Sequence, residues 1–183
     1  MSKAGYKIRN TEGVHFISFA VVEWVDVFTR QQYRDIVVDS LKFCQEQKGL
    51  LLHAWCIMSN HVHLIVSARD KNLSDILRDF KKFTSVELTQ AIKDNPTESR
   101  KDWMLSIFRE AGKANSRNIS HQFWRQDNHP IECFTHEFTR QKLDYLHNNP
   151  VAEGIVANPE DYIYSSAKDY CGKPGLLKLE LLW

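Results

Sequence analysis

Apolar residues alternate with polar ones, or gather with β-branched residues, in three runs of the chain. They cover residues 14–22, residues 50–57 and the stretch that begins at His61, and each run predicts a β-strand. Ser59 and Asn60 separate the second run from the third. We therefore expect these two strands to form an antiparallel hairpin. A shorter strand is expected at residues 123–125.

Between these runs, apolar residues recur at helical spacing. Thr29 and Gln32 have the spacing of a capping box, and Gly49 is a suitable stop for the helix that follows them. Asn72 is expected to cap a second helix. The inner face of this second helix is predicted to hold Leu73, Ile76, Leu77, Phe80 and Phe83.

The second half of the chain predicts two more helices. A short amphipathic helix is expected through Trp103, Ile107 and Phe108, inside a polar and basic stretch at residues 94–121. Thr135 is expected to cap the last helix. Pro150 should end it at Asn149, because the residue before a proline disfavours helical geometry.

The resulting order, β-α-β-β-α-β-α, indicates an α+β fold: an antiparallel β-sheet with helices packed on one face. We expect a single domain over residues 1–183. Within it, residues 94–121 form an inserted basic helical segment, and residues 175–183 form an apolar C-terminal tail that packs as a strand or against a partner subunit.

Composition narrows the class of protein without identifying it. The chain has 183 residues, of which 43% are apolar, and no apolar run approaches a membrane span of roughly 20 residues. Its beginning lacks the apolar core of a signal peptide, so we expect a cytoplasmic protein with no membrane partner. The four cysteines are widely spaced and are expected to be reduced. A net charge of +1 does not itself indicate nucleic-acid binding.

His61 and His63 carry the most specific chemical signal. Residues two apart on a strand point to the same face, so both imidazoles project together. Two neutral imidazoles form half of a divalent-metal site. The alternative is a pair of unrelated, half-buried histidines.

Tyr145 and Asn149 form a second pair, one turn apart on the last helix. A phenol can act as a nucleophile, and a carboxamide oxygen can bind or orient a metal. Taken alone, the pair is better explained as a core aromatic residue and a helix cap. Tyr162, Tyr164 and Tyr170 are rival nucleophiles that lack an Asn or Gln one turn on, and His129, His136 and His147 are rival third ligands.

Several motifs, in one order, resemble those of a known family. Residues 55–65 are similar to the His-hydrophobe-His motif of single-tyrosine transposases. Residues 145–151, with Gly154 and Val156, resemble the tyrosine helix of the REP-associated branch. Residues 81–85, 123–126 and 159–170 also match that branch. The chain is thus identified as similar to REP-associated tyrosine transposases over about residues 14–170.

The resemblance implies a ferredoxin-like, RRM-like endonuclease fold and a concrete activity. Members cut single-stranded DNA next to hairpins and form a 5′-phosphotyrosine. By motif, Tyr145 is the nucleophile, and His61, His63 and Asn149 hold a divalent metal, Mg²⁺ or Mn²⁺. Asn149 stands where insertion-sequence relatives often have Gln; it keeps the carboxamide but has a shorter reach. The resemblance leaves the oligomeric state undecided between a monomer and a homodimer. In relatives, the tyrosine helix acts either in its own subunit or in the other one.

The partner implied is single-stranded or hairpin DNA. A basic stripe on the second helix, together with a basic residue of the 123–126 motif, would contact it: Arg78, Lys81, Lys82 and Arg125. On composition alone the stripe is an ordinary solvated face. Trp103, Phe123 and Trp124 could stack unpaired bases, although core packing explains each at least as well and explains Trp103 better.

Two other functions remain open from the sequence. A histidine-triad nucleotide hydrolase would need a third alternating histidine, but residue 65 is Ile. A hairpin-binding protein that has lost catalysis would not need to keep His61, His63, Tyr145 and Asn149, all of which are present.

Overall fold

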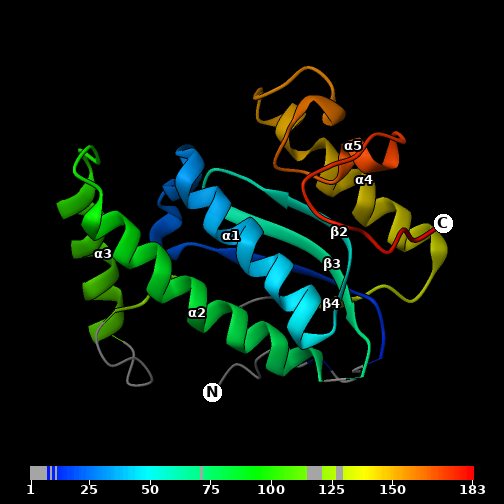
Figure 1. Cartoon of the computed structure of the whole chain (residues 1–183), viewed down its shortest axis with the longest axis horizontal. Coiled ribbons are helices and arrows are strands. Elements are labelled where there is room, and N and C mark those ends of the chain that lie inside the picture. Colours follow the sequence, from blue (N-terminus) through cyan, green and yellow to red (C-terminus); the bar gives the residue numbers. More distant parts are fainter. Residues whose placement is uncertain (1–7, 9, 11, 71, 115–120, 127–129) are drawn as a thin grey trace.

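The computed structural model describes residues 8, 10, 12–70, 72–114, 121–126 and 130–183, which contain both strands and helices (Figure 1). The strands are β1 (His15–Ala20), β2 (Leu50–Ile57), β3 (His61–Ala68) and β4 (Ile131–Glu132). The α-helices are α1 (Gln31–Phe43), α2 (Leu73–Asp94), α3 (Lys101–Lys113), α4 (His136–Ala152) and α5 (Ala167–Tyr170). Short 3₁₀ turns η1 (Val22–Trp24), η2 (Val27–Thr29) and η4 (Pro159–Asp161) and a π-turn, η3 (Cys44–Lys48), lie between them.

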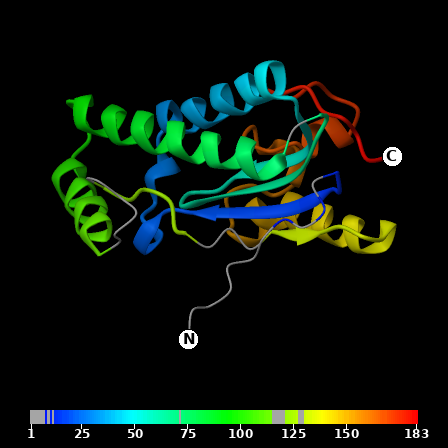
Figure 2. The same cartoon turned by 90° about the horizontal axis from the view of Figure 1, so that it is seen from below.

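The four strands form one antiparallel sheet in the order β2-β3-β1-β4. The α+β fold and the β2–β3 hairpin are therefore confirmed. Helices α1 and α2 pack together on one face of the sheet, and α4 lies across the other (Figure 2). The central pair β1 and β3 is aligned so that Ser18 lies opposite His63 and Ala20 opposite His61. Both histidines thus lie on a central strand, near its first residue.

Burial of apolar side chains fixes the layer formed by α1 and α2. Phe19 of β1 is fully buried and lies 5.8 Å from Phe80 of α2, centroid to centroid. The inner face of α2 continues through Thr84 and Leu88, at the i, i+4 spacing of one helix face. Phe83, which we predicted on that inner face, is 57% exposed, because it lies about a quarter-turn away from this row.

Two of the three predicted helix caps form. Asn72 accepts a hydrogen bond from the amide of Ser74, and Thr135 accepts one from the amide of Phe138. The capping box predicted at Thr29 is wrong, because Arg30 is the N-cap of α1 and provides no side-chain bond. The Thr29 hydroxyl instead donates to the carbonyl of Asp26 and accepts from the Arg100 guanidinium.

Helix α4 does not stop at Asn149 but runs through Pro150 to Ala152. Pro150 lies in the last turn, so its missing N–H removes only one helical hydrogen bond. The end is closed by Gly154, whose φ is 70°, and the amides of Gly154 and Ile155 donate to the carbonyls of Val151 and Pro150. This Schellman closure keeps the last turn, which carries Asn149, helical.

Residues 123–125 do not form the predicted strand. They make one isolated bridge, between Val21 and Trp124, and the fourth strand forms at Ile131–Glu132 instead. Phe123 is fully buried, and Trp124 is 4% exposed and donates from its indole N–H to the Thr84 hydroxyl. The two side chains belong to the core and are not free to stack on DNA.

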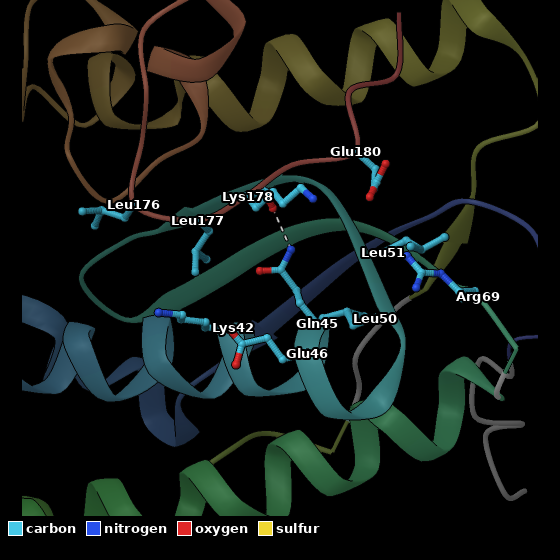
Figure 3. A pocket seen from close by; sticks show the side chains of 10 residues that line it. All are labelled: Lys42, Gln45, Glu46, Leu50, Leu51, Arg69, Leu176, Leu177, Lys178 and Glu180. Carbon is cyan, nitrogen blue, oxygen red and sulfur yellow. Dashed lines mark hydrogen bonds between the residues drawn. The ribbon is translucent and has the colours of Figure 1, made fainter.

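The C-terminal segments cover the outer edge of β2. Amides of Ser166 and Glu180 donate to the carbonyls of Trp55 and Leu52, and the amide of Ile57 donates to the carbonyl of Tyr164. Figure 3 shows the tail passing beside η3, where Gln45 donates to the carbonyl of Lys178. The edge of the sheet is therefore paired with backbone of the same chain. No helix in the described part of the chain is long and apolar enough to cross a bilayer.

Two consecutive residues of turn η1 have left-handed backbone angles: Glu23 at φ 51° and Trp24 at φ 54°. For L-residues this conformation costs roughly 1–2 kcal/mol each. Glu23 is exposed, so Glu23→Gly should relieve strain without loss of packing and raise the free energy of unfolding by about 0.5–1 kcal/mol. Thermal or urea denaturation measures this. Glu23→Gln keeps the Cβ and should leave stability unchanged; equal stabilisation by both variants would show that charge, not backbone strain, is responsible.

Candidate active site

His61 and His63 project from β3 toward the face of the sheet that carries α4. Their ring centroids are 4.6 Å apart, as expected for alternate residues of one strand. His63 is 4% exposed, and its ring stacks at 5.4 Å on that of Phe16 from the neighbouring strand β1. The strand pairing therefore fixes both imidazoles side by side.

One nitrogen of each imidazole is already engaged. His61 Nδ1 lies 2.6 Å from Asn60 Oδ1, so Nδ1 carries the proton and donates it. His63 Nδ1 lies 2.7 Å from the Ser18 hydroxyl. Such partners orient the ring and leave Nε2 as the ligating atom, as is usual for metal-bound histidines.

The surroundings favour the neutral form of both rings. Burial, together with the nearby His61 and Lys142, lowers the pKa of His63 to about 3. Burial also lowers the pKa of His61, although the carboxylate of Glu153 opposes the shift. Neutral imidazole is the form that binds metal ions.

Helix α4 brings the second predicted pair to the same place. The Tyr145 ring meets the His63 ring edge to face at 5.3 Å, and it meets Phe16 similarly at 6.0 Å. Asn149, one turn further on, places Nδ2 3.3 Å from His63 Nε2. Four residues that the sequence singled out in two distant segments thus converge within one chain.

Tyr145 differs from the rival tyrosines in its solvent exposure and in the hydrogen bonding of its hydroxyl. Its side chain is 52% exposed, and its hydroxyl makes no hydrogen bond with the described residues. The hydroxyl of Tyr162 donates to the Ile57 carbonyl, that of Tyr170 to the His53 carbonyl, and that of Tyr164 to Asp35. Burial and Asp35 raise the pKa of Tyr164 to about 12. The three rival tyrosines therefore have structural roles. Of the four tyrosines compared, Tyr145 has the hydroxyl that is accessible to DNA.

Two of the rival third ligands, His136 and His147, lie away from this site. His147 is buried on the inner side of α4, where its Nε2 bonds to the Ser166 hydroxyl. His136 packs against Trp183 at 4.5 Å, and His129 lies outside the described residues. Among the residues that are described, no three His, Cys, Asp or Glu side chains are grouped closely enough to hold a metal ion.

The groups present nevertheless suit a divalent cation. Two neutral imidazoles and an adjacent carboxamide offer nitrogen and oxygen donors, which bind Mg²⁺ or Mn²⁺ together with water and phosphate oxygens. Asn149 presents Nδ2 rather than Oδ1 to His63. For direct ligation, the Asn149 carboxamide would have to turn so that Oδ1, not Nδ2, faces His63.

Lys142 is a functional candidate that the sequence analysis missed. It lies one turn before Tyr145 on α4, with Nζ 5.3 Å from the centre of the Phe16 ring and 5.2 Å from that of Phe138. No carboxylate of the described residues forms an ion pair with it. Its spacing of three residues from Tyr145 is the signal that could have identified it.

The predicted DNA-contacting residues lie in different places. Arg78 is paired with Asp75 and Asp79 on the outer side of α2. Lys81 donates to the carbonyl of Arg125. Lys82 lines a groove between α1 and α2, in the layer on the other side of the sheet from the histidines. Arg125 is closest to the histidines, since it stacks on Trp24, which in turn contacts His61.

Comparison with known proteins gives a consistent result. The model of the family described as IS200-like transposases matches residues 14–126, a range that contains both histidines and ends before α4. A REP-associated tyrosine transposase bound to a REP hairpin has a similar structure, with 17% identity and a TM-score of 0.61 over 96% of this chain and 90% of that one. A candidate transposase from Deinococcus radiodurans R1 gives 17% identity and a TM-score of 0.47 over 81% and 97% of the two chains. No curated protein sequence matches significantly. At 17% identity, the match to the REP-associated transposase establishes the fold.

Proposed function

Because this chain belongs to the family of IS200-like transposases, we propose that it cuts single-stranded DNA beside hairpins and rejoins it through a tyrosine intermediate. The observation that carries this proposal is the convergence of Tyr145 and Asn149 of α4 on His61 and His63 of β3. The similar REP-associated transposase is bound to a REP hairpin, which supports hairpin DNA as the substrate.

In the proposed reaction, the Tyr145 oxygen loses its proton to solvent and attacks the scissile phosphorus. The new O–P bond forms as the bond from phosphorus to the 3′ oxygen breaks, and that oxygen takes up a proton. The products are a 5′-phosphotyrosine and a free 3′-hydroxyl. Attack by a 3′-hydroxyl on the phosphotyrosine reverses the exchange, so joining needs no external energy source.

His61 and His63 would hold a divalent cation, Mg²⁺ or Mn²⁺, through their Nε2 atoms, with Asn149 beside them. Such an ion, when bound, supplies positive charge to the nonbridging oxygens of the scissile phosphate. The Ser18 and Asn60 side chains keep both rings in place. All these residues and Tyr145 come from one chain, which supports a site that needs no second subunit.

Lys142 provides a fixed positive charge next to the nucleophile, and we assign it to a phosphate oxygen of the DNA. Lys142→Met keeps the stem over Phe16 but removes the charge. It should slow cleavage by roughly 10-fold or more and make the slope of log affinity against log salt shallower by about 0.7. Lys142→Arg should preserve both. Lys93→Met, at an exposed position on α2, is the matched control. Equal effects of the two Met variants would show that Lys142 contributes only to the overall positive charge of the protein and makes no specific phosphate contact.

Arg125 is proposed to contact DNA close to the histidines. Contacts by Arg78, Lys81 and Lys82 stay a prediction that requires the DNA to pass over the edge of the sheet onto α2. Of these three, Lys81 lies closest to that edge, since it reaches the Arg125 carbonyl.

The test of the proposed function is an assay on hairpin DNA with single-stranded flanks, carrying a label at either the 3′ or the 5′ end. A 3′ label should appear in a covalent protein–DNA adduct, and a 5′ label in a free fragment that ends in a 3′-hydroxyl. A nucleotide hydrolase would form no such adduct with DNA. Binding without either product would make the protein an inactive hairpin binder.

A further inference from the structure

Trp24 is an aromatic side chain that the fold leaves in solvent at the border of the site. It is 53% exposed, although the flanking Val22 and Val25 are buried. Its ring meets the His61 ring edge to face, at 6.1 Å between centroids and an interplanar angle of 82°. No pattern in the sequence distinguished it from a core tryptophan.

Arg125 lies on the same ring. Its guanidinium carbon is 5.2 Å from the centre of the Trp24 ring, within the range of a cation–π contact. The backbone of Arg125 is held on both sides, because its amide donates to the Ala20 carbonyl and its carbonyl accepts from Lys81. The tryptophan and the arginine thus form a fixed pair that extends the site beyond His61.

The turn that carries Trp24 is held against the start of β3. Asn60 donates from its side chain to the Trp24 carbonyl, at 3.3 Å, and its own carbonyl accepts from the amide of Val21. The same Asn60 side chain orients His61. Trp24 and the proposed metal ligand are therefore positioned by one residue.

The backbone conformation at Trp24 is strained, and packing of its side chain does not offset the cost. Glu23 and Trp24 both have left-handed backbone angles, a conformation that bulky L-residues rarely adopt. A buried tryptophan would offset that cost with apolar contacts, but more than half of this side chain is in water. Strain of this kind gathers at ligand-binding sites.

We propose that Trp24 and Arg125 form a platform on which an unpaired DNA base next to the scissile phosphate stacks. The inference rests on the proposed function and adds a recognition site to it. Every base offers a flat π-face, so an exposed indole backed by a guanidinium suits any unpaired base. Stacking here would seat the phosphate that adjoins the base toward His61 and Tyr145.

The experiment uses hairpin DNA whose single-stranded flanks carry one 2-aminopurine, moved one position at a time. The parent protein is Tyr145→Phe, so that the DNA stays intact. Stacking on an indole quenches 2-aminopurine, and we expect quenching at one position beside the cleavage site. Trp24→Leu should abolish this quenching and Trp24→Phe should keep part of it. Trp103→Leu removes another exposed tryptophan, on α3, and should change nothing.

Affinity gives a second readout. Removing the base at the quenched position should weaken binding to the parent about 5- to 100-fold. The Trp24→Leu variant should bind this abasic DNA and intact DNA with equal affinity. If base removal has equal effects with and without Trp24, the platform is wrong. If wild-type protein forms the adduct but no quenching depends on Trp24, the platform alone fails; if it binds no hairpin, the proposed function fails with it.

Discussion

Replacing Tyr145 with phenylalanine should abolish both the covalent adduct and DNA cleavage while the fold and the affinity for hairpins persist. The variant keeps the ring that packs on His63 and Phe16. It removes only a hydroxyl that no described residue binds, so the free energy of unfolding should change by less than about 0.5 kcal/mol. Cleavage should fall by roughly four orders of magnitude or more, as expected when a nucleophile is lost. Denaturing gels of labelled hairpin DNA measure both products.

Tyr162→Phe is the matched control for this variant. It also removes one hydroxyl, but this one is buried and donates to the Ile57 carbonyl at 2.7 Å. We expect a loss of about 1–3 kcal/mol of stability with unchanged adduct formation. An adduct that persists in Tyr145→Phe would reassign the nucleophile.

The second large effect is expected at the histidines. His61→Ala and His63→Ala should each reduce cleavage to background, because either change removes one of the two imidazoles proposed to bind the cation. Hairpin affinity should remain largely intact, since it comes mainly from phosphate contacts elsewhere. Cleavage rates with Mg²⁺ or Mn²⁺, measured beside hairpin affinity, separate the two effects.

A buried histidine outside the site controls for damage to the fold. His53 of β2 bonds to the Ser67 hydroxyl and to the Glu180 carbonyl. His53→Ala should lower thermal stability but preserve cleavage by the folded protein. Removal of metal by a chelator should stop cleavage by the wild type; a full rate without metal would overturn the metal proposal and leave the tyrosine proposal standing.

The sequence predicted the parts of the site that depend on local geometry. The i, i+2 spacing of a strand placed His61 and His63 together, and the i, i+4 spacing of a helix did the same for Tyr145 and Asn149. The meeting of the two pairs is a long-range contact between β3 and α4, and only the family resemblance anticipated it.

Other features were predicted wrongly or missed, because tertiary contacts override the local preferences that a sequence pattern reports. The buried Phe123 and Trp124 have the composition of a strand, but they leave the sheet after one bridge in order to fill the core. Pro150 is tolerated because it lies in the last turn of α4. Trp24 could not be recognised, since its importance lies in exposure and backbone strain, and neither has a sequence period.

The covered edge of β2 has a consequence for self-association. Carbonyls of Leu52 and Trp55 and the amide of Ile57 already bond to the same chain, so strand addition from a second molecule is blocked on this side. At the opposite edge, the described residues offer the two-residue strand β4. Two copies cannot readily merge their sheets into one continuous sheet across β2. A homodimer that leaves this edge intact would therefore use other surfaces, such as helices or loops.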